Sequence, residues 1–312
     1  MSLIDTTNLG LRDQAGFLSA STSTPGSYSQ IYAFGDSLSD AGNIYTATAH
    51  LLPASPYDDG HFSNGPTWVE DLANDLGLPA LTPSLLGGTD FAFGGAETGQ
   101  EALHNRNILD LPSQLAQFVS AAPSPAPGAL YTLSIGANDV LDSIGAYAAN
   151  PSGAIANIGQ AVANETSFIA ALAADGARNV LVMNVPDLGK APGETSQGGA
   201  VAMTATRLSA LYDSELNAAL GALAAQSGIT IQVMNAFGLL DLAVSHPAAF
   251  GLTNVTDPVW TGTYGNPNSG QLNAVGAAQN GYLFFDQLHP TETGHLALAG
   301  LAQHALAGPA LA

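Results

Sequence analysis

The chain has no cysteine, and its 312 residues include only five lysines and arginines against 25 aspartates and glutamates. Without thiols it has no disulfides, no thiolate nucleophile and no cysteine-ligated metal. The net charge of −20 repels polyphosphate, so DNA and RNA are excluded as partners. The same charge opposes binding to anionic membranes, but it is compatible with a neutral lipid or a small ester as the substrate.

Long apolar runs are also missing. No run approaches the roughly 20 residues that a membrane-spanning helix needs, and the N-terminus has no basic and then apolar signal peptide. We therefore expect no transmembrane span. The opening Met-Ser-Leu is compatible with a trimmed leader, so the sequence leaves the export route open.

Short apolar runs alternate with longer helical patterns from residue 30 onward. Runs typical of strands buried on both faces occupy residues 30–35, 89–95, 129–136, 178–186 and 229–236. Helical spacing of apolar residues occupies 67–78, 112–122, 150–177, 200–228 and 291–306. This alternation predicts an α/β fold, a three-layer α/β/α sandwich in which helices cover both faces of a five-stranded parallel sheet.

The remaining segments indicate a simple domain organisation. Residues 1–29 are polar and rich in small side chains, and we expect a lead-in segment packed on the surface. Residues 30–312 contain no charge run, fixed-period repeat or clear linker, so we expect a single domain. The stretch 241–285 has weak periodicity and many Gly, Asn and Thr residues, which favours an irregular excursion near the site.

Unusual residues follow three of the predicted strands. Ligands of open parallel sheets bind at the carboxyl ends of the strands, near the point where the strand order reverses. These ends carry Gly-Asp-Ser at 35–37, Gly-Gly-Ala at 94–96 and Gly-Ala-Asn-Asp at 136–139. Far downstream, Asp286 and His289 precede the last predicted helix. We expect all four segments to meet at one rim of the sheet.

These residue types match the requirements of acyl transfer to a serine. The hydroxyl of Ser37 needs a base, and His289 supplies one. Asp286, three residues earlier, can orient the imidazole and stabilise its charged form. Negative charge on the substrate oxygen needs preorganised donors, which the N–H groups of Ser37 and Gly95 and the amide of Asn138 can provide.

The same stretches resemble a known family. "GDSLSDAGN", a glycine pair, "GAND" and "DQLH" occur in the order of the four sequence blocks of the SGNH or GDSL esterases and lipases, and the resemblance covers residues 30 to about 305. "GHFSNGPTWVEDLANDLGL" and "FAFGGAETG" resemble the larger bacterial and plant-type members, including autotransporter esterases and haemolysin-like phospholipases.

The resemblance implies a flavodoxin-like SGNH hydrolase fold with five parallel strands and no cofactor. It also implies that Ser37 is the nucleophile, that Gly95 and Asn138 are oxyanion donors, and that Asp286 with His289 completes the catalytic set. Gly95 matches better than Gly94 because a small residue precedes it and Ala-Glu-Thr follows. The resemblance favours a bacterial protein that is secreted or lies at the cell surface.

Simpler interpretations compete at several of these positions. A serine in a turn is usually structural, and Asp36 is typical of a turn brace that accepts backbone N–H bonds. Asn138 at a strand end is typical of a helix cap, unless Asp139 is that cap and leaves Asn138 free. Asp40 either orders the loop after Ser37 or contacts the substrate.

The sequence lacks the motifs of metal sites, of ordinary α/β-hydrolases and of nucleotide-binding sites. Asp286, His289, Glu292 and His295 do not form a strong metal-ligand pattern, so we expect no metal. The chain contains no G-x-S-x-G elbow, no phosphate-binding G-x-x-x-x-G-K-[ST] loop and no dinucleotide G-x-G-x-x-G.

The sequence therefore predicts a serine hydrolase that cleaves carboxylic esters of lipids or small acyl groups through an acyl-enzyme. Acyl transfer to an alcohol other than water and deacetylation of sugars use the same residues and stay open, while a catalytically silent acidic binding module is the alternative of another class. We expect the pocket walls from segments 44–65, 185–199 and 241–285, with His61 and Phe62 near the substrate. No obligate protein partner is evident.

Overall fold

The computed structural model describes residues 28–99, 108–121, 126 and 128–311. Its centre is a parallel sheet of four strands in the order β1-β2-β3-β4, formed by β1 Ile31–Gly35, β2 Leu130–Ser134, β3 Asn179–Met183 and β4 Thr230–Met234. The strands lie in step, since Ile31 is opposite Leu130, which is opposite Asn179. Most of the predicted lead-in segment, up to residue 27, lies outside the described residues.

Helices surround the sheet. They are α1 Asn43–Ala47, α2 Trp68–Asp75, α3 Leu111–Ala121, α4 Ala137–Tyr147, α5 Pro151–Asp175, α6 Pro192–Ser196, α7 Gly199–Ser227, α8 Ala236–Ser245 and α9 Glu292–Ala307. Short 3₁₀ turns are η2 Ser84–Leu86, η3 Leu188–Lys190, η4 Pro247–Phe250 and η5 Gly276–Gly281. The five predicted helices correspond to α2, α3, α5, α7 and α9, whereas α8 shows that the stretch expected to be irregular begins inside a helix.

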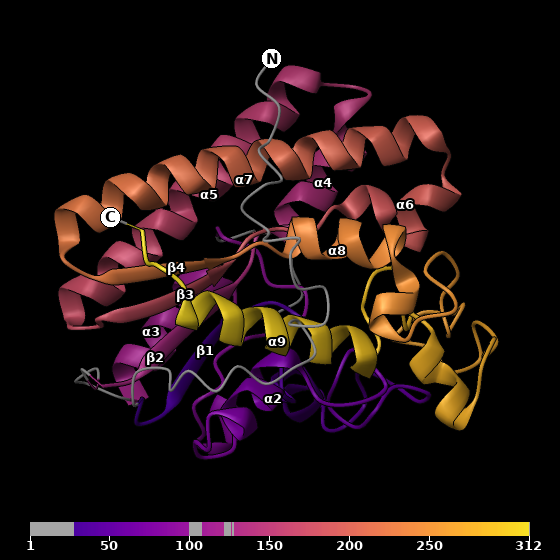
Figure 1. Ribbon diagram of the computed structural model, residues 1–312, viewed down its shortest axis with the longest axis horizontal. Coiled ribbons are helices and arrows are strands. Elements are labelled where there is room, and N and C mark those ends of the chain that lie inside the picture. Colours follow the sequence, from indigo (N-terminus) through magenta and orange to yellow (C-terminus); the bar gives the residue numbers. More distant parts are fainter. Residues whose placement is uncertain (1–27, 100–107, 122–125, 127, 312) are drawn as a thin grey trace.

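Alternate residues of each strand face opposite layers, as a pleated strand requires. On β1, Tyr32 and Phe34 pack in a hydrophobic cluster with residues of α3, α5 and α7. Ile31 and Ala33 face a second cluster that includes residues of α2, α8 and α9. Figure 1 shows α5 and α7 on one side of the strands and α2 and α9 on the other. The predicted three-layer α/β/α architecture is confirmed.

The predicted fifth strand, residues 89–95, is wrong as a regular strand. The segment does lie along the free edge of β1, where Thr89 accepts the Ala33 N–H at 3.0 Å and Phe91 donates to the Ala33 carbonyl at 2.7 Å. The next N–H of β1 that would continue the ladder belongs to Gly35, and it donates instead to the side chain of Gln114 at 2.9 Å. A side chain thus replaces the backbone partner of this N–H. Phe93 still donates to the Gly35 carbonyl at 3.0 Å, so the segment stays beside β1, but it forms only one isolated bridge with that strand and not a regular ladder.

The order of these segments creates a switch point. The chain leaves β1, runs beside one edge of it at residues 89–93, and then returns as β2 on its other side. Connections therefore diverge at the carboxyl end of β1, the place where open α/β sheets bind ligands. Among the described residues, no helix combines the length and the apolarity that crossing a bilayer requires.

Gly35 is where β1 meets this switch point, and we predict that Gly35→Ala destabilises the fold. Its φ of +136° is unfavourable for other residues, and an added Cβ would lie 1.9 Å from the carbonyl oxygen of Ser134 on β2. We expect the free energy of unfolding, measured in denaturant, to fall by about 3 kcal/mol or more.

Gly221→Ala is the matched control. Gly221 lies inside α7, and apart from the nearby backbone of its own helix no atom of the described residues lies within 4 Å of a new Cβ. This variant is therefore expected to be more stable by about 0.5–1 kcal/mol. Equal effects of the two variants would contradict the steric argument.

Candidate active site

A relay of three polar side chains lies at the carboxyl end of β1. Ser37 lies just after β1, separated from it by Asp36, and its Oγ lies 2.8 Å from Nε2 of His289 in the loop before α9. The other ring nitrogen of His289, Nδ1, lies 2.8 Å from Oδ2 of Asp286. All three residues are buried. The structure therefore brings together three of the residues singled out in the sequence, although 252 positions separate Ser37 from His289.

Asp286 is held by four donors. Its Oδ1 accepts the backbone N–H groups of Leu288 at 2.8 Å and His289 at 2.7 Å, which folds the loop around the carboxylate. Its Oδ2 accepts the hydroxyl of Tyr57 at 2.6 Å, in addition to the imidazole. Tyr57 could not be predicted from the sequence, because this residue lies in an irregular loop 229 positions from its partner.

Burial and nearby charge have opposite effects on the pKa values of His289 and Asp286. Burial lowers the pKa of His289, but Asp286 and, more weakly, Asp36 stabilise the charged ring and raise the pKa above its ordinary value. Burial likewise raises the pKa of Asp286, but His289 and the surrounding donors outweigh it and lower that pKa. Asp286 therefore stays ionised and keeps the imidazole basic.

The candidate oxyanion donors are the backbone N–H groups of Ser37, of Gly94 or Gly95, and the side-chain amide of Asn138. The Gly94 N–H donates to Oδ2 of Asp40 at 2.8 Å, so it is occupied. Gly95 has a φ of +82°, and neither its N–H nor that of Ser37 has an acceptor among the described residues. Nδ2 of Asn138 donates one hydrogen to the Ala96 carbonyl at 2.8 Å and keeps the second. Of the two candidate glycines, Gly95 is the one with an available donor.

The start of α4 is tied to the glycine loop. Asp139 accepts both the N–H of Thr98, at 3.1 Å, and its hydroxyl, at 2.6 Å. Asp139 is not the cap of the helix, as one interpretation of the sequence had it, because the N-cap position is Gly136. This carboxylate therefore links the two segments that carry Gly95 and Asn138.

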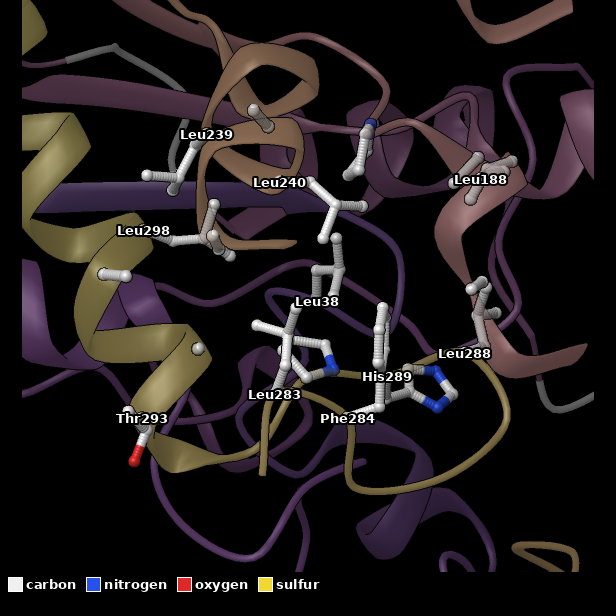
Figure 2. Close-up of a pocket in the computed structure, with 18 of the residues that line it drawn as sticks. Leu38, Leu188, Leu239, Leu240, Leu283, Phe284, Leu288, His289, Thr293 and Leu298 are labelled. Atoms are coloured by element: carbon white, nitrogen blue, oxygen red, sulfur yellow. The ribbon is translucent and has the colours of Figure 1, made fainter. Parts of the chain in front are cut away.

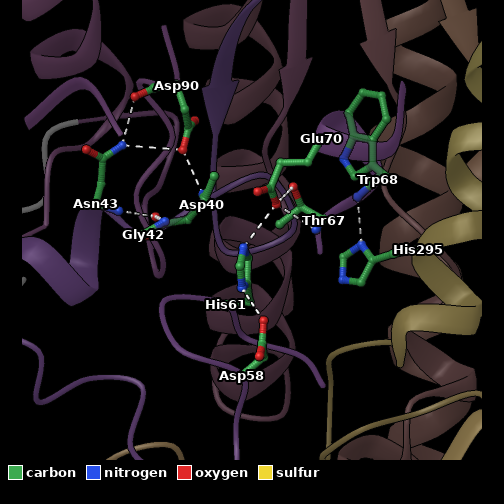
Figure 3. Close-up of polar contacts among 11 residues, drawn as sticks. Asp40, Gly42, Asn43, Asp58, His61, Thr67, Trp68, Glu70, Asp90 and His295 are labelled. Atoms are coloured by element: carbon green, nitrogen blue, oxygen red, sulfur yellow. Dashed lines mark hydrogen bonds and ion pairs between the residues drawn. The ribbon is translucent and has the colours of Figure 1, made fainter. Parts of the chain in front are cut away.

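Asp40 braces the loop after Ser37. Its carboxylate accepts the N–H groups of Gly42, Asn43 and Ile44 and that of Gly94. The side chain is fully buried and does not line the cavity described below. Figure 3 shows it beside Asn43 and Asp90. Burial raises the pKa of Asp40 to about 6, against the lowering effect of its backbone hydrogen bonds.

The other two residues expected near the substrate also lie off the cavity. His61 sits between Asp58 at 2.9 Å and Glu70 at 3.1 Å (Figure 3). Phe62 is buried, and its ring centre lies 5.3 Å from that of His289. Phe62 thus packs against the imidazole with its ring tilted by 35°, whereas His61 belongs to a charged cluster with α2.

An apolar cavity opens beside Ser37 and His289, with an empty volume of about 880 Å³ that includes solvent-open space. Figure 2 shows Leu239 and Leu240 of α8 and Leu298 of α9 around it. Its few polar lining residues are Asp36, Ser37, Asn138, His289 and Thr293. Walls come from segments 185–199 and 241–285, as expected from the sequence, and from α9, but 44–65 lines none of this cavity.

Asp36 lines the cavity next to Ser37. Its Oδ1 accepts the N–H of Leu38 at 3.0 Å, which is the bracing role expected of it. Its Oδ2 is buried without a hydrogen-bond partner among the described residues. Burial raises the pKa of Asp36 to about 7, while the Leu38 N–H and His289 act in the opposite direction.

This chain matches one family model and several known proteins. The family model described as GDSL-like Lipase/Acylhydrolase matches residues 31–301. The chain is 29% identical to the phosphatidylcholine-sterol acyltransferase of Aeromonas hydrophila, over 87% of this chain and 88% of that protein. It is 25% identical to the thermolabile hemolysin of Vibrio parahaemolyticus, over 87% of this chain and 62% of that protein. The solved structure of LAE5, an alpha/beta hydrolase enzyme from the metagenome of Lake Arreo, has a TM-score of 0.46 and 14% identity, covering 90% of this chain and 99% of that one.

The opposing effects at His289 give a titration that NMR can measure. We predict that its ring titrates above about 6.5, the ordinary value for histidine, because Asp286 outweighs burial. Its charged form therefore adds stability that is fully present below the unfolded pKa and is lost as the pH rises through the folded pKa. In Asp286→Asn, burial dominates, and the ring should titrate below about 6.5. An unchanged titration in that variant would refute the assigned cause.

Proposed function

The chain belongs to the GDSL-like lipase/acylhydrolase family, and on that premise we propose that it hydrolyses carboxylic esters through an acyl-enzyme on Ser37. The relay from Ser37 through His289 to Asp286, at 2.8 Å for each step, is the observation that carries the proposal. A hydroxyl, a base and an orienting carboxylate within hydrogen-bond reach form the arrangement that activates a serine.

In the first half-reaction, Oγ of Ser37 attacks the ester carbonyl while Nε2 of His289 takes its proton. The carbonyl oxygen becomes an oxyanion, and the N–H groups of Ser37 and Gly95 and the free amide hydrogen of Asn138 are its donors. The tetrahedral intermediate collapses, the bond to the alkoxy oxygen breaks, and His289 returns its proton to the departing alcohol. The acyl group stays on Ser37.

In the second half-reaction, water replaces the alcohol. His289 takes a proton from the water as its oxygen attacks the acyl carbonyl, and the same donors stabilise the second oxyanion. Collapse breaks the bond to Oγ, which regains its proton from His289, and the carboxylic acid leaves. Asp286 stays ionised throughout and stabilises the imidazolium that forms twice in each cycle.

Ser37→Ala tests the nucleophile. We expect kcat for p-nitrophenyl butyrate to fall at least about 10⁴-fold, because members of such a unit act together, while the thermal midpoint stays near that of the parent. Ser227→Ala, on the far end of α7, is the control and should keep full activity. A fluorophosphonate probe should label the parent at Ser37, whereas full turnover by Ser37→Ala, or an unlabelled parent, would rule out the assignment and favour a silent binding module.

The wall of the cavity supports an apolar acyl group. Leu239 and Leu240 of α8, Leu298 of α9 and Leu283 and Phe284 all border the space next to Ser37. The binding free energy becomes more favourable by about 0.8 kcal/mol for each methylene of the acyl chain that moves from water into such a cavity. The cavity offers few hydrogen-bond partners for the hydroxyl groups of a sugar. We therefore propose lipid-type esters with several acyl carbons rather than acetylated sugars as substrates.

Filling the cavity should change chain-length preference. Ala297 on α9 lines the cavity and is half-buried, so a larger side chain there has room to settle. In Ala297→Phe we expect kcat/KM for p-nitrophenyl decanoate to fall by about tenfold or more, the equivalent of two or more lost methylene contacts, with p-nitrophenyl acetate changed less than about twofold.

Ala307→Phe, at the exposed end of the same helix, is the matched control and should leave both esters unaffected. Equal losses on the acetate and the decanoate in Ala297→Phe would contradict the proposed acyl site, without bearing on the role of Ser37.

Acyl transfer is the second candidate function. The relative named phosphatidylcholine-sterol acyltransferase matches 87% of this chain, which favours an alcohol other than water as an acceptor of the same acyl-enzyme. Product analysis with a sterol added to the ester assay separates the two reactions, because transfer forms a sterol ester in place of the free acid. A location outside the cell stays a prediction, which the similarity to a protein named hemolysin supports.

A further inference from the structure

We propose that Tyr57 is a positioning residue for this reaction: its hydroxyl fixes the Asp286 carboxylate and limits how strongly that carboxylate holds a proton on His289. The inference rests on the proposed function, because it concerns the same relay. It adds a residue that lies outside the four sequence blocks.

The geometry places Tyr57 on the oxygen that matters. Its hydroxyl donates to Oδ2 of Asp286 at 2.6 Å, and the same oxygen lies 2.8 Å from Nδ1 of His289. The two donors compete for the negative charge of one atom. The opposite oxygen, Oδ1, is already occupied by two backbone N–H groups at 2.7 and 2.8 Å. Without the tyrosine, the carboxylate loses the only side-chain donor other than the imidazole that the described residues give it.

The surroundings make Tyr57 a fixed donor. The residue is 6% exposed and belongs to a small apolar cluster with Val259, Trp260 and Phe285. Its ring packs edge-on against Phe285 at 4.9 Å between ring centres. Burial, followed by the charge of Asp286, raises the pKa of the Tyr57 hydroxyl, so it remains protonated wherever the enzyme is assayed. A phenylalanine would keep the ring packing and remove only the hydroxyl.

The electrostatic consequence has a defined sign. A hydrogen bond to Oδ2 stabilises the carboxylate and draws charge away from the imidazole. When this hydrogen bond is removed, more of the negative charge of Asp286 acts on His289, so the pKa of the imidazole ring should rise. The released carboxylate also loses its fixed orientation, so the proton transfer from Ser37 should slow.

Other titratable groups facing this pair stay in place. Asp36 raises the pKa of His289, His295 lies within electrostatic reach of it, and Tyr264 lies near Tyr57. Burial raises the pKa of Asp36 to about 7, so this group can also contribute to a pH–rate profile, and the NMR ring signals of His289 are the direct readout for that one residue.

Tyr57→Phe is the test, with Tyr131→Phe as the matched control. Tyr131 is a buried tyrosine of β2 whose hydroxyl makes a long contact of 3.4 Å with the Ala126 carbonyl, and it does not line the cavity. In Tyr57→Phe we expect kcat for p-nitrophenyl butyrate to fall about tenfold, as loss of a hydrogen bond to a charged group implies, with KM changed less than about twofold. The acid limb of the pH–rate profile and the His289 titration should both move upward, by about half a pH unit. Tyr131→Phe should change neither.

Three outcomes would overturn the proposal: an unchanged kcat in Tyr57→Phe, a lower kcat with an unmoved His289 titration, or the same kinetic change in Tyr131→Phe. If Tyr57→Phe fails to fold, 3-fluorotyrosine at position 57 replaces it. This residue is a stronger donor, so the acid limb should move downward, and an upward or absent shift would refute the proposal. Failure of the proposed function itself would appear separately, as turnover by Ser37→Ala.

Discussion

The contact between the Ser37 hydroxyl and the His289 imidazole is the interaction on which the site depends. Ser37 is fixed by the sheet, because only Asp36 separates it from β1. His289 is fixed by a loop that folds back on itself through the bond from the Phe285 N–H to the His289 carbonyl at 2.8 Å. A proton passes between them only within hydrogen-bond reach. The packing of α9 on the sheet, through residues such as Leu298 and Leu301, is therefore a condition for the chemistry.

Buried carboxylates hold the loops around this contact. Asp40, Asp139 and Asp286 each accept several donors, most of them backbone N–H groups from loops that meet at the rim. Burying a carboxylate is expensive unless it is hydrogen-bonded. In a chain with only five lysines and arginines, main-chain N–H groups do what basic side chains do in other proteins. The acidic composition thus serves the interior as well as the surface.

The elements that local pattern could predict were those with strong periodicity or strong end signals. Helix α5 begins at Pro151, its cap Asn150 accepts the N–H of Gly153, and Gly176 follows its end, so its bounds followed closely from the sequence. The segment 89–95 has the composition of a strand, yet Gln114 of α3 takes the Gly35 N–H that would extend the ladder. A competing side chain from elsewhere in the chain is invisible to periodicity.

Residue types and their order determined the chemistry of the site. The serine after the first strand, the Asp-x-x-His pair near the end, the glycine pair and the asparagine each have a role that acyl transfer requires, and no other class of motif is present. Four features were decided by the tertiary structure alone. Within the described part of the chain, Gly95 and not Gly94 keeps a free N–H, and Asp40 braces a loop. Tyr57 donates to Asp286, and α8 and α9 form an apolar wall. These outcomes depend on distances between segments that are far apart in the chain, and such distances are set by packing in three dimensions, which local sequence does not encode.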